Sequence, residues 1–272
     1  MGMVRPLRAL ARPARAATIP ILMYHSISDD LDERRGPYYR TVTSPARFRR
    51  HMETLRRRGY RALTLADAAR ELAGPQRADA APAVAVTFDD GYDDFRTAAF
   101  PVMRDLGIAA TVFVSTGFLG KPFLDGRPCL GAADVEALAA QGVEFGSHTV
   151  THPQLHDVPA TRRREELSRS RETIAALVGG SVPSFCYPFR FPSEDPAFTA
   201  SLVEELSVCG YHQGVTTTIG VARPGDPGYL LCRVPVNDCD DDAFFEAKLD
   251  GHYDWLRLPQ SARKQLRAIF GI

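Results

Sequence analysis

The sequence predicts an α/β protein, a single-domain distorted (β/α) barrel of about seven parallel strands. Apolar, β-prone runs alternate with helical patterns nearly to the C-terminus, as in folds with a parallel sheet. No nucleotide-binding glycine fingerprint follows a strand, which favours a closed barrel over an open doubly wound sheet. Polar clusters come directly after several of the runs, where barrel proteins carry their functional loops.

The first elements are a strand over residues 19–24 and two helices. The first helix begins at Ser44 and Pro45, which suit a helix start, and Gly59 ends it. Its apolar residues share one face, and a second helix over residues 64–72 follows directly. A polar linker at 75–82 separates this part from the next strand.

The remaining elements continue the alternation. Predicted strands cover 83–88, 108–115, 143–147, 184–188, 212–220 and 229–236, and predicted helices cover 94–107, 132–142, 161–180, the stretch up to Cys209, and 241–256. With the first strand, these make seven strand-like runs.

Composition indicates a soluble protein with one full-sized core. The chain has 272 residues, 44% of them hydrophobic, and a formal net charge of zero, so no global charge draws it to nucleic acid. No stretch reaches the roughly 20 apolar residues of a membrane span. Five cysteines without a CxxC pair indicate reduced thiols in a cytoplasm.

The N-terminal segment is treated separately from the predicted domain. Residues 1–17 are basic and lack the apolar run of a secretory signal, so we expect a disordered arm followed by a catalytic domain over 18–272. This also predicts a cytoplasmic location, with membrane association only through partners.

Two adjacent carboxylates, Asp89 and Asp90, follow the strand over 83–88 and precede Gly91. Neighbouring side chains at a strand end point in different directions, so one can bind a metal ion while the other acts as a base. A solvated Asp-Gly turn is the alternative.

His148 and His152 are four residues apart and come directly after another predicted strand. This spacing lets both imidazoles bind one ion if the loop forms a helical turn. Two histidines and one carboxylate leave open coordination positions, which suits Zn²⁺, with Co²⁺ or Ni²⁺ as alternatives. The other histidines, His51, His156, His212 and His252, are interpreted as structural or surface residues.

These motifs together resemble a known family. TFDDG at 87–91 and HTVTHP at 148–153 are similar to motifs of the NodB-type polysaccharide deacetylases of carbohydrate esterase family 4. FCYPF at 185–189 and LMYHSI at 22–27 resemble the subgroup acting on exopolysaccharide and poly-N-acetylglucosamine. The resemblance covers residues 20–255, nearly the whole chain.

The resemblance implies a role for each motif residue. Asp89 would be the base that deprotonates a metal-bound water, and Asp90, His148 and His152 would be the metal ligands. Within Tyr187, Pro188 and Phe189, the backbone N–H of Phe189 would stabilise the oxyanion. His25 would protonate the leaving amine, unless it is a structural histidine at a strand end.

The chain departs from the family pattern at Cys186, where an arginine usually orients the base. Two other arginines could take this role: Arg233, in the strand over 229–236, and Arg190. A surface salt bridge is the alternative for either.

We therefore expect metal-dependent hydrolysis of N-acetyl groups on an amino-sugar polymer or glycan intermediate. The same site could act on a non-sugar amide, a cyclic imide or an O-acetyl ester, and a catalytically dead sugar-binding module is a further alternative. A glycosyltransferase system is the expected partner. Tyr38, Tyr39 and Phe123 are candidates for stacking on sugar, or for ordinary packing.

Overall fold

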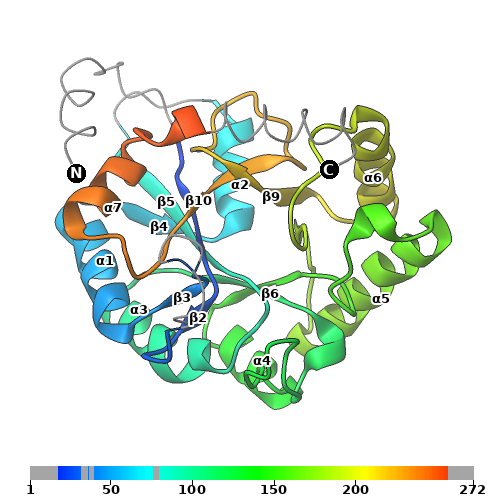
Figure 1. Ribbon diagram of the computed structural model, residues 1–272, viewed down its shortest axis with the longest axis horizontal. Helices are drawn as coiled ribbons and strands as arrows, with labels where there is room; N and C mark the ends of the chain where they lie inside the picture. Colours follow the sequence, from blue (N-terminus) through cyan, green and yellow to red (C-terminus); the bar gives the residue numbers. More distant parts are fainter. Residues whose placement is uncertain (1–17, 32–35, 37–39, 76–79, 257–272) are drawn as a thin grey trace.

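The computed structural model describes residues 18–256 apart from 32–35, 37–39 and 76–79 (Figure 1). The predicted arm at 1–17, and Tyr38 and Tyr39, lie outside the described residues. No helix of the described part is long and apolar enough to cross a membrane.

The centre of the fold is a closed ring of parallel strands. In the described chain the order is β1, β10, β9, β8, β7, β6 and β5, and pairing of β1 with β5 closes the ring. This confirms the predicted barrel. The strands are β1 (Ile21–Tyr24), β5 (Ala83–Phe88), β6 (Thr111–Val114), β7 (Glu144–Ser147), β8 (Ser184–Cys186), β9 (Gln213–Ile219) and β10 (Leu231–Pro235).

Three short strands lie outside this ring. β4 (Arg61–Leu63) pairs with the first half of β5, and β2 (Ser26–Ile27) pairs with β3 (Val42–Thr43). These runs are too short to give a clear periodicity, which explains why the sequence pattern did not indicate them.

Helices surround the ring (Figure 1). Their bounds are α1 (Pro45–Arg57), α2 (Leu65–Ala73), α3 (Phe100–Leu106), α4 (Ala132–Ala139), α5 (Ala160–Val178), α6 (Pro196–Val208) and α7 (Asp242–Leu249); single turns are η3 (Phe95–Ala99), η4 (Thr116–Phe118), η5 (Leu155–Asp157) and η6 (Asp254–Leu256). The helix predicted over 241–256 ends early, and Gly251 follows with φ of 74°, a conformation that stops a helix.

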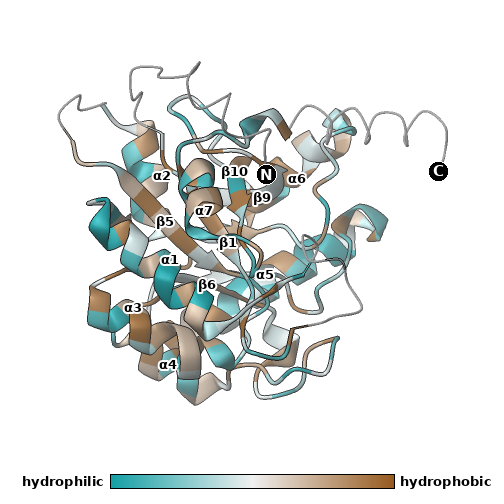
Figure 2. Cartoon of the chain, turned by 60° about the vertical axis from the view of Figure 1, so that its left-hand side comes forward, coloured by the Kyte–Doolittle hydropathy of each residue, from teal (hydrophilic) through white to brown (hydrophobic). Residues whose placement is uncertain are grey.

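The hydrophobic core consists of several clusters of buried residues. All six residues of β5 are buried, and most of β5 is hydrophobic in Figure 2. One buried cluster contains residues from six of the ring strands together with Leu65, Ala68 and Leu72 of α2. The first turn of α2 is also hydrogen-bonded to β6 and β7: the backbone N–H of Leu65 donates to Thr111 Oγ1, and that of Ala66 donates to the Glu144 carboxylate. Because both partners begin their strands, α2 covers the N-terminal end of the barrel.

Candidate metal centre and active site

The predicted site residues meet at the C-terminal ends of the ring strands. Asp89 and Asp90 follow β5, His148 follows β7, and His25 follows β1. Parallel strands bring these ends to one mouth of the barrel, so residues that are far apart in the sequence become neighbours.

Three side chains at this mouth point at a common position. Asp90 Oδ1 lies 3.5 Å from His148 Nε2 and 3.4 Å from His152 Nε2, and the two Nε2 atoms are 3.2 Å apart. His148 Nδ1 donates to the carbonyl oxygen of Cys186 at 2.8 Å, which orients the ring with Nε2 toward Asp90 and His152. Two imidazoles and a carboxylate at this spacing fit a divalent ion such as Zn²⁺.

The electrostatics differ among these groups. Burial alone would lower the pKa of His148, but the neighbouring Cys186 and the hydrogen bond to Asp90 raise it well above its usual value, so a metal ion would bind there in competition with a proton. Burial and the neighbouring His148 lower the pKa of His152 to about 4, so its imidazole is neutral near pH 7. Burial alone would raise the pKa of Asp90, but the hydrogen bond and charge of His148 and the nearby histidines lower it below its usual value. Asp90 can therefore bind a metal ion as an anionic ligand beside the neutral imidazole of His152.

A second group of donors, Asp89, His148 and Cys186, is also close enough to surround an ion. Arg233 Nη2, however, lies 2.7 Å from Asp89 and 3.2 Å from Cys186 Sγ. A guanidinium in that position repels a metal cation. The Asp90, His148 and His152 group is therefore the better metal site.

Among the described non-glycine residues, positive φ angles occur only at this mouth. φ is positive at Asp90 (71°), Thr149 (69°), His152 (54°) and Phe189 (57°). A positive φ costs energy for a side chain with a Cβ, and such residues cluster at functional sites. At Gly91, with φ of 73°, a Cβ would approach Val114 Cγ1 to 2.8 Å, so the turn after the two aspartates requires glycine.

A buried glutamate holds the loop that carries His152. Glu166 of α5 is 1% exposed, and its carboxylate accepts from the backbone N–H groups of Val150 and Thr151, both at 2.8 Å, and from the Thr151 hydroxyl. Sequence reasoning missed this residue, because a glutamate in a polar helix carries no signal of burial. Glu166 fixes the strained loop from outside the metal position.

Asp89 is held by Arg233 and not by Arg190. Arg233 Nη1 and Nη2 donate to the two Asp89 oxygens at 2.6 and 2.7 Å, and its Nε donates to Thr216 O at 3.0 Å. The register of β10 shifts between Leu231 and Arg233, an irregularity of the kind that re-aims a side chain. Arg190 is 47% exposed and pairs with Glu194 instead, so it does not orient the base.

The Arg233 contact keeps Asp89 ionised. Burial by itself would raise the pKa of this carboxyl, but the charge and hydrogen bonds of Arg233 outweigh burial and hold the pKa well below its usual range. The pKa of Arg233 is raised in turn, because the stabilising charge of Asp89 exceeds the cost of its own burial.

The remaining predicted residues lie around this pair. His25 Nε2 is 3.9 Å from Asp89 Oδ2, and the His25 side chain is 19% exposed. Phe189 is 46% exposed, and its ring centroid is 4.4 Å from that of His152. Tyr187, by contrast, is buried beneath the surface, next to Pro188. Phe123 is only 8% exposed and packs edge-on against His152, which favours the packing alternative over sugar stacking.

Comparison with known proteins identifies the family. The polysaccharide deacetylase family model matches residues 76–213, and the chain belongs to this family. YxkH of Bacillus subtilis, whose name assigns it provisionally to the polysaccharide deacetylases, is 28% identical over 242 residues, covering 89% of this chain and 80% of that protein. The poly-β-1,6-N-acetyl-D-glucosamine N-deacetylase of Staphylococcus aureus is 21% identical, covering 58% of this chain and 55% of that protein.

Solved structures share the fold. The Streptococcus pyogenes deacetylase PplD, determined in complex with acetate, superimposes with a TM-score of 0.75 at 23% identity, over 86% of this chain and 99% of that one. IcaB from Ammonifex degensii gives a TM-score of 0.68 at 24% identity, over 92% of this chain and 98% of that one.

Proposed function

We propose that this protein is a metal-dependent deacetylase that hydrolyses N-acetyl groups on an amino-sugar polymer. The observation that supports it most is the pairing of two neighbouring carboxylates with different partners. Asp89 is bound by Arg233, whereas Asp90 faces His148 and His152. One carboxylate is thus available as a base and the other as a ligand, as metal-assisted hydrolysis requires.

Each side chain then has a defined task. A divalent ion held by Asp90, His148 and His152 would polarise the acetyl carbonyl and lower the pKa of a water molecule. Asp89, kept anionic by Arg233, accepts the proton of the attacking water. His25 donates a proton to the nitrogen as the carbon–nitrogen bond breaks, so that water and amide become acetate and amine.

The FCYPF segment at 185–189 supplies the remaining contact. The backbone N–H of Phe189 donates to the oxygen that becomes negative when water adds to the carbonyl. The positive φ of Phe189 and the contact of its ring with His152 keep this backbone segment beside the ligand loop. A strained residue in this place is consistent with a functional constraint.

The substrate class is inferred from the relatives. The staphylococcal protein is named for poly-β-1,6-N-acetyl-D-glucosamine, and a Sinorhizobium fredii protein 32% identical over 132 residues is named a chitooligosaccharide deacetylase. This chain spans 55% and 56% of those two proteins. Their shared chemistry, an N-acetylglucosamine polymer, is the class we propose here. The glycosyltransferase partner and the cytoplasmic location stay predictions.

Acetate release tests the proposal. We expect metal-free protein to be inactive on N-acetylglucosamine oligomers and to recover activity with Zn²⁺, Co²⁺ or Ni²⁺. Asp89→Asn should lower kcat on the order of 10²–10⁴-fold, because the base is lost. Asp93→Asn is the matched control, since Asp93 is a nearby carboxylate of the same segment, four residues after Asp89, but pairs with the surface residue Arg96.

Two outcomes would contradict the proposal. Metal binding with no acetate release from any oligomer would move the site to another amide, an imide or an ester. Equal activity of the Asp89→Asn and Asp93→Asn proteins would remove Asp89 as the base.

A further inference from the structure

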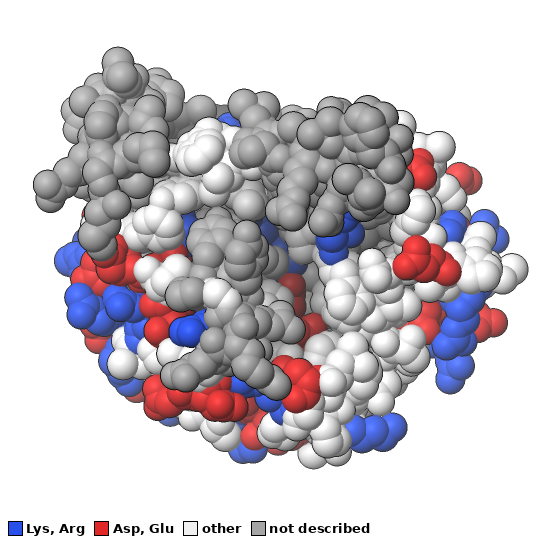
Figure 3. All heavy atoms as spheres, viewed as in Figure 1, with Lys and Arg blue, Asp and Glu red and all other residues white. Residues whose placement is uncertain are grey.

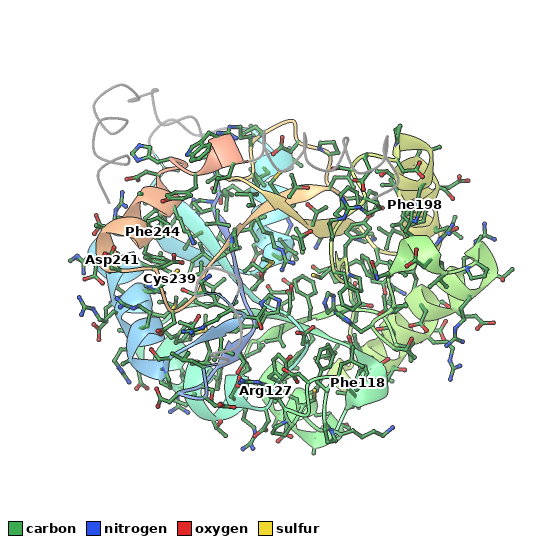
Figure 4. The ribbon with its side chains drawn as sticks, in the orientation of Figure 1. Phe118, Arg127, Phe198, Cys239, Asp241 and Phe244 are labelled. Atoms are coloured by element: carbon green, nitrogen blue, oxygen red, sulfur yellow. The ribbon has the colours of Figure 1, made fainter. Side chains whose placement is uncertain are left out.

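Three loops at the barrel mouth meet at the residue that directly follows His25. Ser26 is 1% exposed, and its hydroxyl donates to Asp94 Oδ2 at 2.5 Å and accepts from Arg127 Nη1 at 2.8 Å. Ser26 begins β2, just beyond the end of β1, and Asp94 lies in the segment between β5 and η3. Arg127 lies on the loop between β6 and α4, where Figure 4 labels it. The function proposed above uses none of these three side chains.

The Arg127 side chain connects two of these loops. Besides the bond to Ser26, its Nη2 donates to the carbonyl oxygen of Asp30 at 2.8 Å, and its Nε lies 3.4 Å from an Asp125 oxygen. Basic and acidic side chains are interspersed on the face seen in Figure 3, and exposed ion pairs contribute little to stability. Arg127 differs from such residues because its side chain is only 19% exposed and hydrogen-bonds to the chain on both sides of Ile27.

The loop that carries Arg127 is in turn hydrogen-bonded to the segment that follows the two aspartates. The backbone N–H of Leu130 donates to the carbonyl oxygen of Gly91 at 2.9 Å. The backbone N–H of Asp93 donates to the carbonyl oxygen of Pro128, also at 2.9 Å. Arg127 therefore has a fixed place relative to the catalytic base, and its bond to the serine hydroxyl fixes the start of β2 relative to that base as well.

His25 is held from both of its neighbours in the chain. On one side, the carbonyl oxygen of Tyr24 accepts from the backbone N–H of Asp89 at 3.0 Å, which ties the end of β1 to the base. On the other side, Ser26 is held by its two side-chain hydrogen bonds and by the pairing of β2 with β3. These contacts fix the backbone of His25 and keep its Nε2 3.9 Å from Asp89 Oδ2.

We propose that Ser26, held by Asp94 and Arg127, is a positioning residue for the proton donor His25. The inference rests on the function proposed above and adds the residues that place its acid. An amine leaves readily only when its nitrogen receives a proton, so a misplaced donor slows the breaking of the carbon–nitrogen bond. Addition of water to the carbonyl, which depends on Asp89, does not require this placement.

Two substrates with different leaving groups test the inference. An N-acetylglucosamine tetramer releases an amine, which needs a proton, whereas 4-nitrophenyl acetate releases a weakly basic phenolate, which does not. With zinc-loaded protein, we expect Ser26→Ala to lower kcat on the tetramer on the order of tenfold with KM unchanged, because the donor is misplaced and not lost. Hydrolysis of 4-nitrophenyl acetate should keep its wild-type rate, which also shows that the variant is folded and holds the metal.

Replacement of Arg127 gives a second, independent variant. Arg127→Met removes the cation that holds Ser26 and should cause the same selective loss on the tetramer, whereas Arg127→Lys keeps the charge and should lose less. Arg96→Met is the matched control. Among the described residues Arg96 pairs with Asp93 and Asp134, so it joins the segment after β5 to α4 without contacting β2. It should behave as wild type on both substrates.

A double-mutant cycle separates positioning of His25 from a general weakening of the fold. His25→Ala alone should lower kcat on the tetramer on the order of 10²–10⁴-fold, the usual contribution of a positioned proton donor. Adding Ser26→Ala should lower it no further, because no donor is left to misplace. A further loss in the double variant, or equal losses on both substrates in Ser26→Ala, would overturn the inference.

The same measurements distinguish failure of this inference from failure of the proposed function. If the wild-type protein releases acetate from the tetramer and Ser26→Ala does so equally fast, the positioning role is refuted and the deacetylase remains. If zinc-loaded wild-type protein hydrolyses 4-nitrophenyl acetate but releases no acetate from the tetramer, the deacetylase is refuted. The roles of His25 and Ser26 toward an amine are then refuted with it.

Discussion

The molecule contains two buried arginine–carboxylate pairs of nearly the same geometry in two different regions. At the barrel mouth, Arg233 donates two hydrogen bonds to Asp89 at 2.6 and 2.7 Å. Between α5 and α6, Arg163 donates two to Glu205 at 2.9 and 2.8 Å. In both pairs the carboxylate is at most 4% exposed.

What surrounds the pairs differs. Asp89 has His25 at 3.9 Å and directly precedes a residue of the metal site. Arg163 has the carbonyl oxygen of Val158 and the ring of Phe198 as its other neighbours, and these serve packing. The comparison shows that a buried ion pair does not by itself identify a functional site. The Arg233–Asp89 pair differs by its position at the C-terminal ends of barrel strands, where barrel proteins carry their functional loops.

The largest expected effect on activity comes from replacing Arg233 at the barrel mouth. Arg233→Met leaves Asp89 buried and unpaired, so we expect kcat to fall about 100-fold or more through misplacement of the base, and the free energy of unfolding to fall by about 3 to 5 kcal/mol. Arg233→Lys keeps the charge but not the two-pronged contact and should be intermediate. Acetate release and urea unfolding measure both effects.

Arg190→Met is the matched control for this change, because Arg190 was the other candidate from the sequence. With a fully acetylated substrate it should behave as wild type. A loss of activity comparable to that of Arg233→Met would transfer the orienting role to Arg190.

Breaking the Arg163–Glu205 ion pair should affect stability alone. Arg163→Met leaves Glu205 buried without its partner, and we expect the free energy of unfolding to fall by about 3 to 5 kcal/mol while kcat of the folded protein on a fully acetylated substrate stays unchanged. Replacing both, as Arg163→Met with Glu205→Leu, should recover most of the stability. Arg164→Met, on the exposed side of the same helix, should change it by less than about 0.5 kcal/mol.

The distinction between a catalytic and a structural ion pair would be wrong if Arg163→Met lowered kcat as strongly as Arg233→Met. The two regions would then be coupled, and the Arg163 pair would belong to the active site.

The smallest expected effect concerns Glu166, three residues from Arg163 on the same helix. Glu166→Gln keeps the shape but removes the charge that accepts from Val150 and Thr151, so we expect metal affinity to fall about tenfold. Competition with a chelator measures it. Glu165→Gln is the control, and unchanged metal affinity in Glu166→Gln would show that the loop holds its shape without this contact.

Much of the fold could be predicted because it depends on local pattern. Each of the seven ring strands falls in a short β-prone run of the sequence, and Ser44 and Pro45 begin α1 as predicted, with the Ser44 hydroxyl accepting from the backbone N–H of Arg47. The motif residues were found for a related reason: adjacent aspartates and histidines four residues apart are visible in the chain itself. The pairing of β1 with β5, and the short strands outside the ring, depend on long-range contacts that leave no periodic signal.

The sequence by itself determined the strand and helix alternation, the residue types of the candidate site and the family to which they belong, since these follow from nearest neighbours and short spacings. Only the tertiary structure decided between Arg233 and Arg190 and placed Glu166 behind the metal loop. The physical reason is that a side chain's partner depends on which strand ends and helices the closed barrel brings together.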